Sequence, residues 1–185
     1  MTVRTHLRRT VAVLAVAGAT AGMTALAAGT ASAEGGYGPS VFPCTANQFS
    51  GKVVYGGAGA GNRNAAIQFT ANPGERCSLP GKLGVDLVGA RNVLVDNQAP
   101  ADAPAVVLAD GSSAYVPLHW TAIEAEAQQQ TPNGLTFTAP SDSNPHGDHI
   151  DPNVTLGWDL GPVDAGADSH TLDVGALTRG TAPTA

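Results

Sequence analysis

The sequence contains few charged and few aromatic residues, and these two deficits exclude several classes of protein. Only 13% of its 185 residues are Asp, Glu, Lys or Arg, and only 5% are Phe, Trp or Tyr. An average soluble domain carries about 25% charged residues. Coiled coils, helical repeats and nucleic-acid-binding domains all depend on many more charges than this chain has. We therefore expect none of these three classes.

The sequence also lacks the linear motifs of common hydrolases and nucleotide-binding enzymes. It contains neither a G-x-S-x-G nor an S-x-x-K motif. The glycine-rich stretch at residues 56–62 is followed by Arg63 and a strand pattern, whereas a phosphate-binding loop leads into a helix with Lys and Ser or Thr close behind. We interpret this stretch as a flexible hairpin loop. A triad assembled from distant residues has no linear signature. On the motifs present, we predict that the chain is not an enzyme and takes no cofactor.

The first 33 residues have the pattern of a secretory signal peptide. Three arginines stand within the first nine residues, and the uncharged stretch at residues 11–33 ends in Ala-Ser-Ala. This pattern predicts export and cleavage between Ala33 and Glu34, by either the general or the twin-arginine route. A membrane-spanning helix is the alternative, but the Gly and Thr residues of the stretch weaken both helix formation and lipid affinity. We expect no membrane span after cleavage.

The charge balance is acidic and becomes more so if the signal peptide is removed. Nine basic and fifteen acidic residues give a formal net charge of −6. Three of the basic residues precede Ala33, so six remain against fifteen acids, a net charge of −9. An acidic surface repels nucleic acids and anionic membranes. We therefore predict no nucleic-acid partner.

Cys44 and Cys77 are the two cysteines of the chain. An exported chain meets oxidising conditions, so a disulfide between them is expected. It would close a loop of about 34 residues and stabilise the fold by about 3–4 kcal/mol in the chain-entropy model. A cysteine metal site or a catalytic thiol needs a ligand spacing or a nearby His that the sequence lacks. The 152 residues after Ala33 (185 minus 33) are enough for one domain.

Short runs of alternating apolar and polar residues, separated by turn residues, follow the signal sequence. A period of two is typical of strands with one buried face. About eight such runs at spacings of about 8–15 residues predict a sandwich of antiparallel β-sheets. The runs lie at residues 49–55, 65–71, 83–87, 93–95, 106–108, 114–120, 135–137, 154–158 and 172–174.

Particular residues refine this prediction. Pro117 cannot donate to a ladder, so we expect its strand at a sheet edge or with a bulge. Trp120 and Trp158 continue inward-facing alternations, which favours core packing over stacking on sugar rings. His119 lies on the opposite face from Trp120 and is expected to be half-exposed. Residues 121–130 show no alternation and predict one or two helical turns.

Several of these segments together resemble a known family. They are C-T-A-N-Q-F-S from Cys44, I-Q-F-T-A-N from Ile67, C-S-L-P-G from Cys77 and D-G-S-S-A-Y-V-P-L-H-W up to Trp120. The chain resembles the secreted actinobacterial domain-of-unknown-function family 4232 from Cys44 to about Leu177. The resemblance implies an immunoglobulin-like sandwich, export and a structural Cys44–Cys77 bridge. It implies no activity. We expect an N-terminal extension at 34–43, the domain at 44–178 and a C-terminal tail at 179–185.

The densest group of chemically active side chains lies in one predicted loop. Carboxylates suit calcium, and His with Asp suits zinc or another transition metal, so this loop is a candidate metal site. Its spacing fits neither an EF-hand loop nor the H-E-x-x-H motif. The alternative is a polar loop between strands, where Asp, Asn, Gly, Pro and Ser are common. The candidate ligands are Asp142, His146, Asp148, His149 and Asp151.

The sequence as a whole predicts a secreted, all-β, non-catalytic module that acts by binding. Loops at the ends of a sandwich are the usual recognition surfaces, so we consider the glycine-rich loop 56–64 and the acidic loop 140–153. The expected partner is a cell-envelope polymer or an extracellular protein. The alternative is a metal-dependent secreted enzyme or a metal-binding protein that uses residues 142–151.

Overall fold

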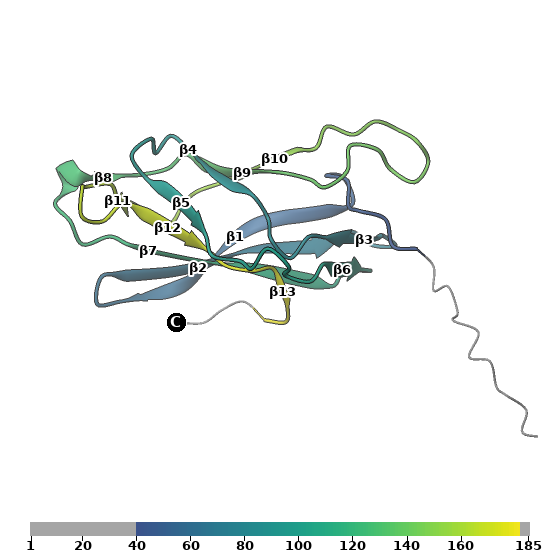
Figure 1. Ribbon diagram of the computed structural model, residues 1–185, viewed down its shortest axis with the longest axis horizontal. Coiled ribbons are helices and arrows are strands. Elements are labelled where there is room, and N and C mark those ends of the chain that lie inside the picture. The colour runs from purple at the N-terminus through teal and green to yellow at the C-terminus, as the bar shows by residue number, and fades with distance from the viewer. Residues whose placement is uncertain (1–39, 182–185) are drawn as a thin grey trace, which may run out of the picture. The chain divides into compact units, whose positions relative to one another are not determined.

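The computed structural model describes residues 40–181 of the chain (Figure 1). The predicted signal peptide and its cleavage between Ala33 and Glu34 lie outside the described residues. Within the described range the regular elements are strands and one short 3-10 turn, so the all-β prediction is confirmed. No helix in residues 40–181 is long and apolar enough to cross a membrane.

The larger sheet has six strands. The first five lie in the order β1, β2, β7, β12, β5, and the sixth, β13, adds to β7 beyond the end of β12. Neighbours are antiparallel, except that β12 and β5 run parallel. The predicted antiparallel architecture therefore holds, and the parallel β12–β5 pair makes the larger sheet a mixed one. The strands are β1 (Phe49–Gly59), β2 (Asn62–Ala71), β5 (Leu94–Asn97), β7 (Ser113–Thr121), β12 (Thr171–Val174) and β13 (Thr178–Arg179).

A smaller antiparallel sheet packs against the larger one. Its strands lie in the order β10 (Asn153–Gly157), β9 (Gly134–Thr138), β4 (Val85–Val88). Figure 1 shows them above the strands of the larger sheet. Two short pairs complete the fold, and they join β8 (Gln129–Gln130) to β11 (Val163–Asp164) and β3 (Arg76–Leu79) to β6 (Val106–Ala109).

Aromatic side chains join the two sheets across the core. The ring of Phe137 on β9 lies with its centroid 5.0 Å from that of Phe69 on β2 and 6.1 Å from that of Phe49 on β1. The Trp120 and Trp158 rings lie 5.0 Å apart, and both side chains are buried. The core position predicted for the two tryptophans is confirmed. Their indole N–H groups donate to the carbonyls of Pro162 and Gly161, which satisfies their polar atoms.

The predicted disulfide is present between Cys44 and Cys77, and both residues are fully buried. It holds the segment before β1 against the free edge of β3. The Cys44 N–H donates to the Ser78 carbonyl, and the Ser78 N–H donates to the Phe42 carbonyl. The bridge therefore fixes the start of the domain to the short β3–β6 pair.

The glycine-rich stretch 56–62 is not a flexible loop. It belongs to β1 and β2, which pair down to Gly59 and Asn62 and leave a turn of two residues. Ala60 and Gly61 both have positive φ angles, 48° and 86°, as in the type I′ turn that matches the twist of a hairpin. The predicted hairpin is confirmed, and its small residues allow a tight turn in place of the predicted flexible loop.

Pro117 lies in a central strand, so the predicted edge position is wrong. β7 pairs with β2 on one side and with β12 and β13 on the other. The Pro117 carbonyl accepts a bond from the Gly175 N–H, so the position of the missing N–H also faces this second side. There β12 ends at Val174 and β13 begins at Thr178. The break between the two short strands accommodates the missing donor.

The helical segment predicted at residues 121–130 is reduced to one 3-10 turn, Glu126–Gln128. The two glutamines that follow form β8 instead, because they pair with β11.

Candidate functional site

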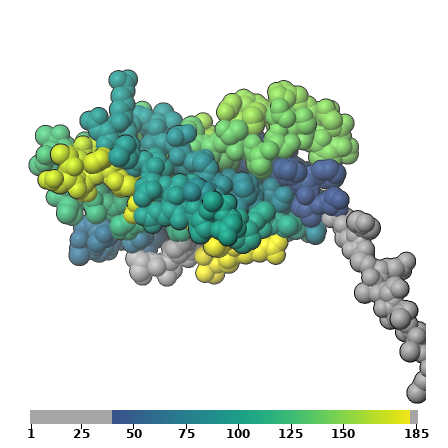
Figure 2. All heavy atoms as spheres, in the orientation of Figure 1, coloured from purple at the N-terminus to yellow at the C-terminus, as the bar shows by residue number. Residues whose placement is uncertain are grey.

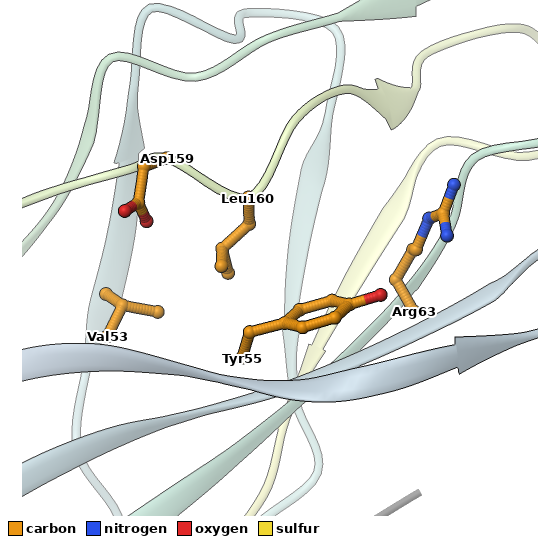
Figure 3. A pocket seen from close by; sticks show the side chains of 5 residues that line it. All are labelled: Val53, Tyr55, Arg63, Asp159 and Leu160. Carbon is orange, nitrogen blue, oxygen red and sulfur yellow. The ribbon is translucent and has the colours of Figure 1, made fainter.

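A cleft opens where the inner face of the larger sheet extends past the smaller sheet. It has a volume of about 400 Å³ and is lined by Val53, Tyr55, Arg63, Asp159 and Leu160 (Figure 3). The first two come from β1, Arg63 comes from β2, and the last two follow β10. The two walls are therefore formed by segments about one hundred residues apart in the chain.

The hairpin register places Tyr55 and Arg63 on the core-facing side of the sheet. Directly opposed residues of an antiparallel pair share a face. Tyr55 opposes the buried Ala65, and Arg63 opposes the buried Trp120. This face is apolar along the rest of β2, but at the hairpin end of the sheet it carries the phenol of Tyr55 and the guanidinium of Arg63. Tyr55 is 52% exposed, so the sandwich is open at this end.

The polar side chains of this cleft have no partners among the described residues. Within residues 40–181, no hydrogen bond or ion pair is made by the side chains of Tyr55, Arg63 or Asp159. Figure 3 shows the Tyr55 hydroxyl directed toward Arg63, with Asp159 and Leu160 on the opposite wall. A cation, a hydroxyl and a carboxylate are thus available to a ligand in one cavity, beside the apolar side chains of Val53 and Leu160.

The cleft continues into a second hollow along the same strand edges. This hollow, about 480 Å³, shares Val53 and Asp159 with the first and is also lined by Lys52, Thr155 and Trp158. We call the two together the edge groove, because it runs between β1 and β10, the outer strands of their sheets. Two of the six basic residues that follow Ala33 line it, against one acid. Its ionisable groups give a formal charge of +1 on a chain that is otherwise acidic.

The wall beyond Leu160 is held by a buried carboxylate that sequence reasoning missed. Asp164 is 1% exposed. It accepts hydrogen bonds from the backbone N–H groups of Ile123 and Glu124 and from the side chain of Gln129, at 3.0–3.1 Å. Burial raises the pKa of this carboxyl, but these bonds and one from Thr121 outweigh burial, so the pKa lies below its usual value. A single Asp in a polar segment carries no sequence signal for this role.

A separate polar hollow, which is not part of the edge groove and has a volume of about 230 Å³, lies on the outer face of the larger sheet. It is lined in part by His119, whose side chain is 43% exposed, as predicted. The His119 Nδ1 lies 3.2 Å from an Asp173 oxygen, and Nε2 lies 3.0 Å from the side-chain oxygen of Asn62. Both ring nitrogens are thus engaged with side chains of β12 and β2.

Comparison with known proteins identifies the family but no function. The family model described as "Domain of unknown function (DUF4232)" matches residues 44–178, well over half of the chain. The chain belongs to the DUF4232 family. No curated protein and no solved structure matches it. The edge groove of this DUF4232 domain therefore has to be judged on its own chemistry.

The acidic loop of this DUF4232 domain joins β9 to β10 and projects from the surface (Figures 1 and 2). Asn144 organises it. Its side-chain oxygen accepts the N–H groups of His146 and Asp148, and its amide donates to an Asp148 oxygen at 3.0 Å. These bonds are those of a polar turn.

The candidate metal ligands of the loop are exposed, and one pair of them is in contact. His149 Nδ1 and an Asp142 oxygen lie 3.9 Å apart, and Asp151 accepts hydrogen bonds from Asn153. Nowhere in the described part of the chain do three or more His, Cys, Asp or Glu side chains form a group that could hold a metal ion. The predicted metal site stays a prediction, with no cluster in residues 40–181 to support it.

Proposed function

We propose that this chain is a secreted, non-catalytic binding module, located outside the cell or in the cell envelope, and that the edge groove is its ligand site. The observation that carries this proposal is that Tyr55, Arg63 and Asp159 surround one open cavity and that their polar groups find no partner within residues 40–181. Polar side chains that fold into a concave site without partners retain their hydrogen-bonding capacity for a ligand.

The disulfide supports a location outside the cytoplasm. Disulfides persist in oxidising compartments and are rare in reducing ones. The Cys44–Cys77 bridge lies in the core and is the only place where cysteine occurs in the chain. The amino-terminal pattern favours the same location.

The contacts of His119 support binding over nucleophilic catalysis at that residue. A nucleophilic enzyme needs a base with one nitrogen free to accept the proton of a hydroxyl or thiol. Both nitrogens of His119 contact other side chains, Asp173 and Asn62. The first cleft of the edge groove is lined by no Ser, Thr, Cys or His among the described residues.

Co-sedimentation with cell-wall material tests the proposal. We expect the purified protein to pellet with actinobacterial wall material at moderate salt and Tyr55→Ala to reduce the pelleted fraction several-fold. Tyr115→Ala is the matched control, because Tyr115 lies on β7 opposite Gln68, on the other face of the sheet. Full recovery of the wild-type protein in the supernatant would contradict an envelope ligand. Equal effects of the two substitutions would contradict the edge groove as its site.

A further inference from the structure

We propose that the Tyr55–Arg63–Asp159 end of the edge groove binds a sugar that carries a carboxylate, as a unit of an acidic polysaccharide. This inference rests on the proposed function and names the chemistry of its ligand. Each of the three side chains supplies one part of the recognition.

Arg63 supplies the contact to the carboxylate. Its guanidinium offers five N–H donors in a planar fork that matches the two oxygens of a carboxylate. The side chain is half-buried, and no acid of the described chain pairs with it. The Tyr55 hydroxyl, directed toward it, adds a further donor (Figure 3). The site is thus a partly desolvated cation on an acidic protein, which favours an anionic ligand.

Tyr55 supplies an apolar platform. Its ring lies on the inner face of the sheet, beside Val53 and below Leu160 (Figure 3). About half of it is exposed, although every apolar side chain further along this face of β2 is buried. The C–H face of a pyranose can cover such a ring and remove its apolar surface from water.

Asp159 selects for hydroxyl groups and against a high density of negative charge. A carboxylate only accepts hydrogen bonds, so on the wall opposite Arg63 it suits the hydroxyl donors of a sugar. It also repels a doubly charged group such as a phosphate monoester. A ligand with one negative charge and several hydroxyls therefore satisfies all three side chains.

The edge of β1 argues against an extended peptide as the ligand. A peptide that adds to a sheet needs a regular row of unpaired N–H and C=O groups. The β1–β2 register shifts between Tyr55 and Gly57, which marks a β-bulge at the position of the cleft. A bulge twists the edge strand and interrupts that row. Side-chain recognition of a sugar does not depend on it.

An NMR titration of the purified protein tests this ligand chemistry. The probes are glucuronate, glucose as its neutral match, glucose 6-phosphate and an acidic tetrapeptide. We expect glucuronate to shift the amide signals around Tyr55 and Arg63 and to bind about tenfold more tightly than glucose. Glucose 6-phosphate and the peptide should bind more weakly than glucuronate.

Two pairs of variants assign the roles. Arg63→Gln should remove the preference for glucuronate over glucose, whereas Arg76→Gln, an exposed arginine of β3, should leave it unchanged. Tyr55→Phe keeps the platform and should retain most of the affinity that Tyr55→Ala loses. Unchanged amide spectra away from the groove establish that each variant is folded.

The possible failures separate the two proposals. Equal affinity for glucose and glucuronate, tighter binding of the peptide or the phosphate, or equal effects of the two arginine substitutions would overturn the acidic-sugar proposal. If wall binding that depends on Tyr55 persists in any of those cases, the binding-module proposal still stands. If the wild-type protein binds neither the wall material nor glucuronate, the acidic-sugar proposal and the binding-module proposal are both overturned.

Discussion

Both carboxylate oxygens of Asp164 accept the backbone N–H of Ile123, at 3.0 and 3.1 Å, and this contact ties the segment after β7 to β11. The carboxylate is the buried acid of the described domain. It holds the segment that follows β7 against the segment that runs from the edge groove to β11. A negative charge can be stable there because charge-assisted hydrogen bonds replace its water shell.

Asp164→Asn should destabilise the domain by about 2–3 kcal/mol, because hydrogen bonds to a charged acceptor are strong and the new amide group would face backbone donors. Urea denaturation measures the change in the free energy of unfolding. Asp168→Asn is the matched control, since Asp168 is exposed and four residues further along the chain. Equal effects of the two substitutions would show that the hydrogen bonds of Asp164 contribute little.

The lowered pKa of Asp164 predicts how stability depends on pH. In the unfolded chain an Asp titrates near about pH 3.9. The folded protein binds this proton less readily, so the stabilisation by Asp164 is complete above that pH and is lost as the pH falls through the lower folded pKa. The melting temperature of the wild-type protein should therefore fall more steeply than that of Asp164→Asn between about pH 5 and about pH 2. Parallel curves in calorimetry would contradict this assignment.

Most of the fold could be predicted from local sequence, because burial on one face imposes a period of two. The alternating residues from Ala114 to Trp120 lie in β7, and their apolar side chains are buried as predicted. Strand order could not be predicted in this way. Whether β7 lies at an edge depends on which strands return to it, and the parallel contact of β12 with β5 joins segments more than seventy residues apart.

The edge groove could not be predicted, because its residues carry no shared local pattern. Asp159 is about one hundred residues from Tyr55 and Arg63, and only packing of β10 against β1 brings it near. One residue of the site did have a signal. A turn at Ala60 and Gly61 with regular pairing puts Arg63 on the buried face but puts Tyr55 opposite Ala66, on the other face. Only the register shift between Tyr55 and Gly57, which has no clear sequence signal, brings Tyr55 to the same face as Arg63. A guanidinium on an otherwise buried face indicates that this face is open to solvent there.

Removal of the Cys44–Cys77 bridge should cost about 3–4 kcal/mol, since the bridge closes a loop of about 34 residues in the unfolded chain. Denaturation with and without a thiol reductant measures this cost. The double variant Cys44→Ala/Cys77→Ala serves as the control and should not respond to the reductant. A reductant effect of the same size in that variant would mean that the change is not due to the disulfide.

The loop at residues 142–151 gives a direct choice between a metal site and a polar turn. A metal site predicts that millimolar calcium or zinc raises the melting temperature and that a chelator lowers it. Because Asn144 already engages Asp148 and Asp151 accepts bonds from Asn153, we expect no shift. A rise with either ion that is lost in His149→Ala would establish the metal site instead.

Gly61 should be intolerant of substitution for two independent reasons. Its φ angle of 86° is one that residues with a side chain rarely adopt, and a Cβ there would overlap Cγ2 of Ile123. Gly61→Ala should therefore destabilise the domain by about 1–2 kcal/mol. Gly59→Ala is the matched control, because a Cβ at Gly59 meets nothing within 4 Å. Thermal denaturation compares the two variants. If Gly61→Ala is as stable as Gly59→Ala, the hairpin turn is not of the type described, and the register that places Tyr55 and Arg63 in one cleft loses its support.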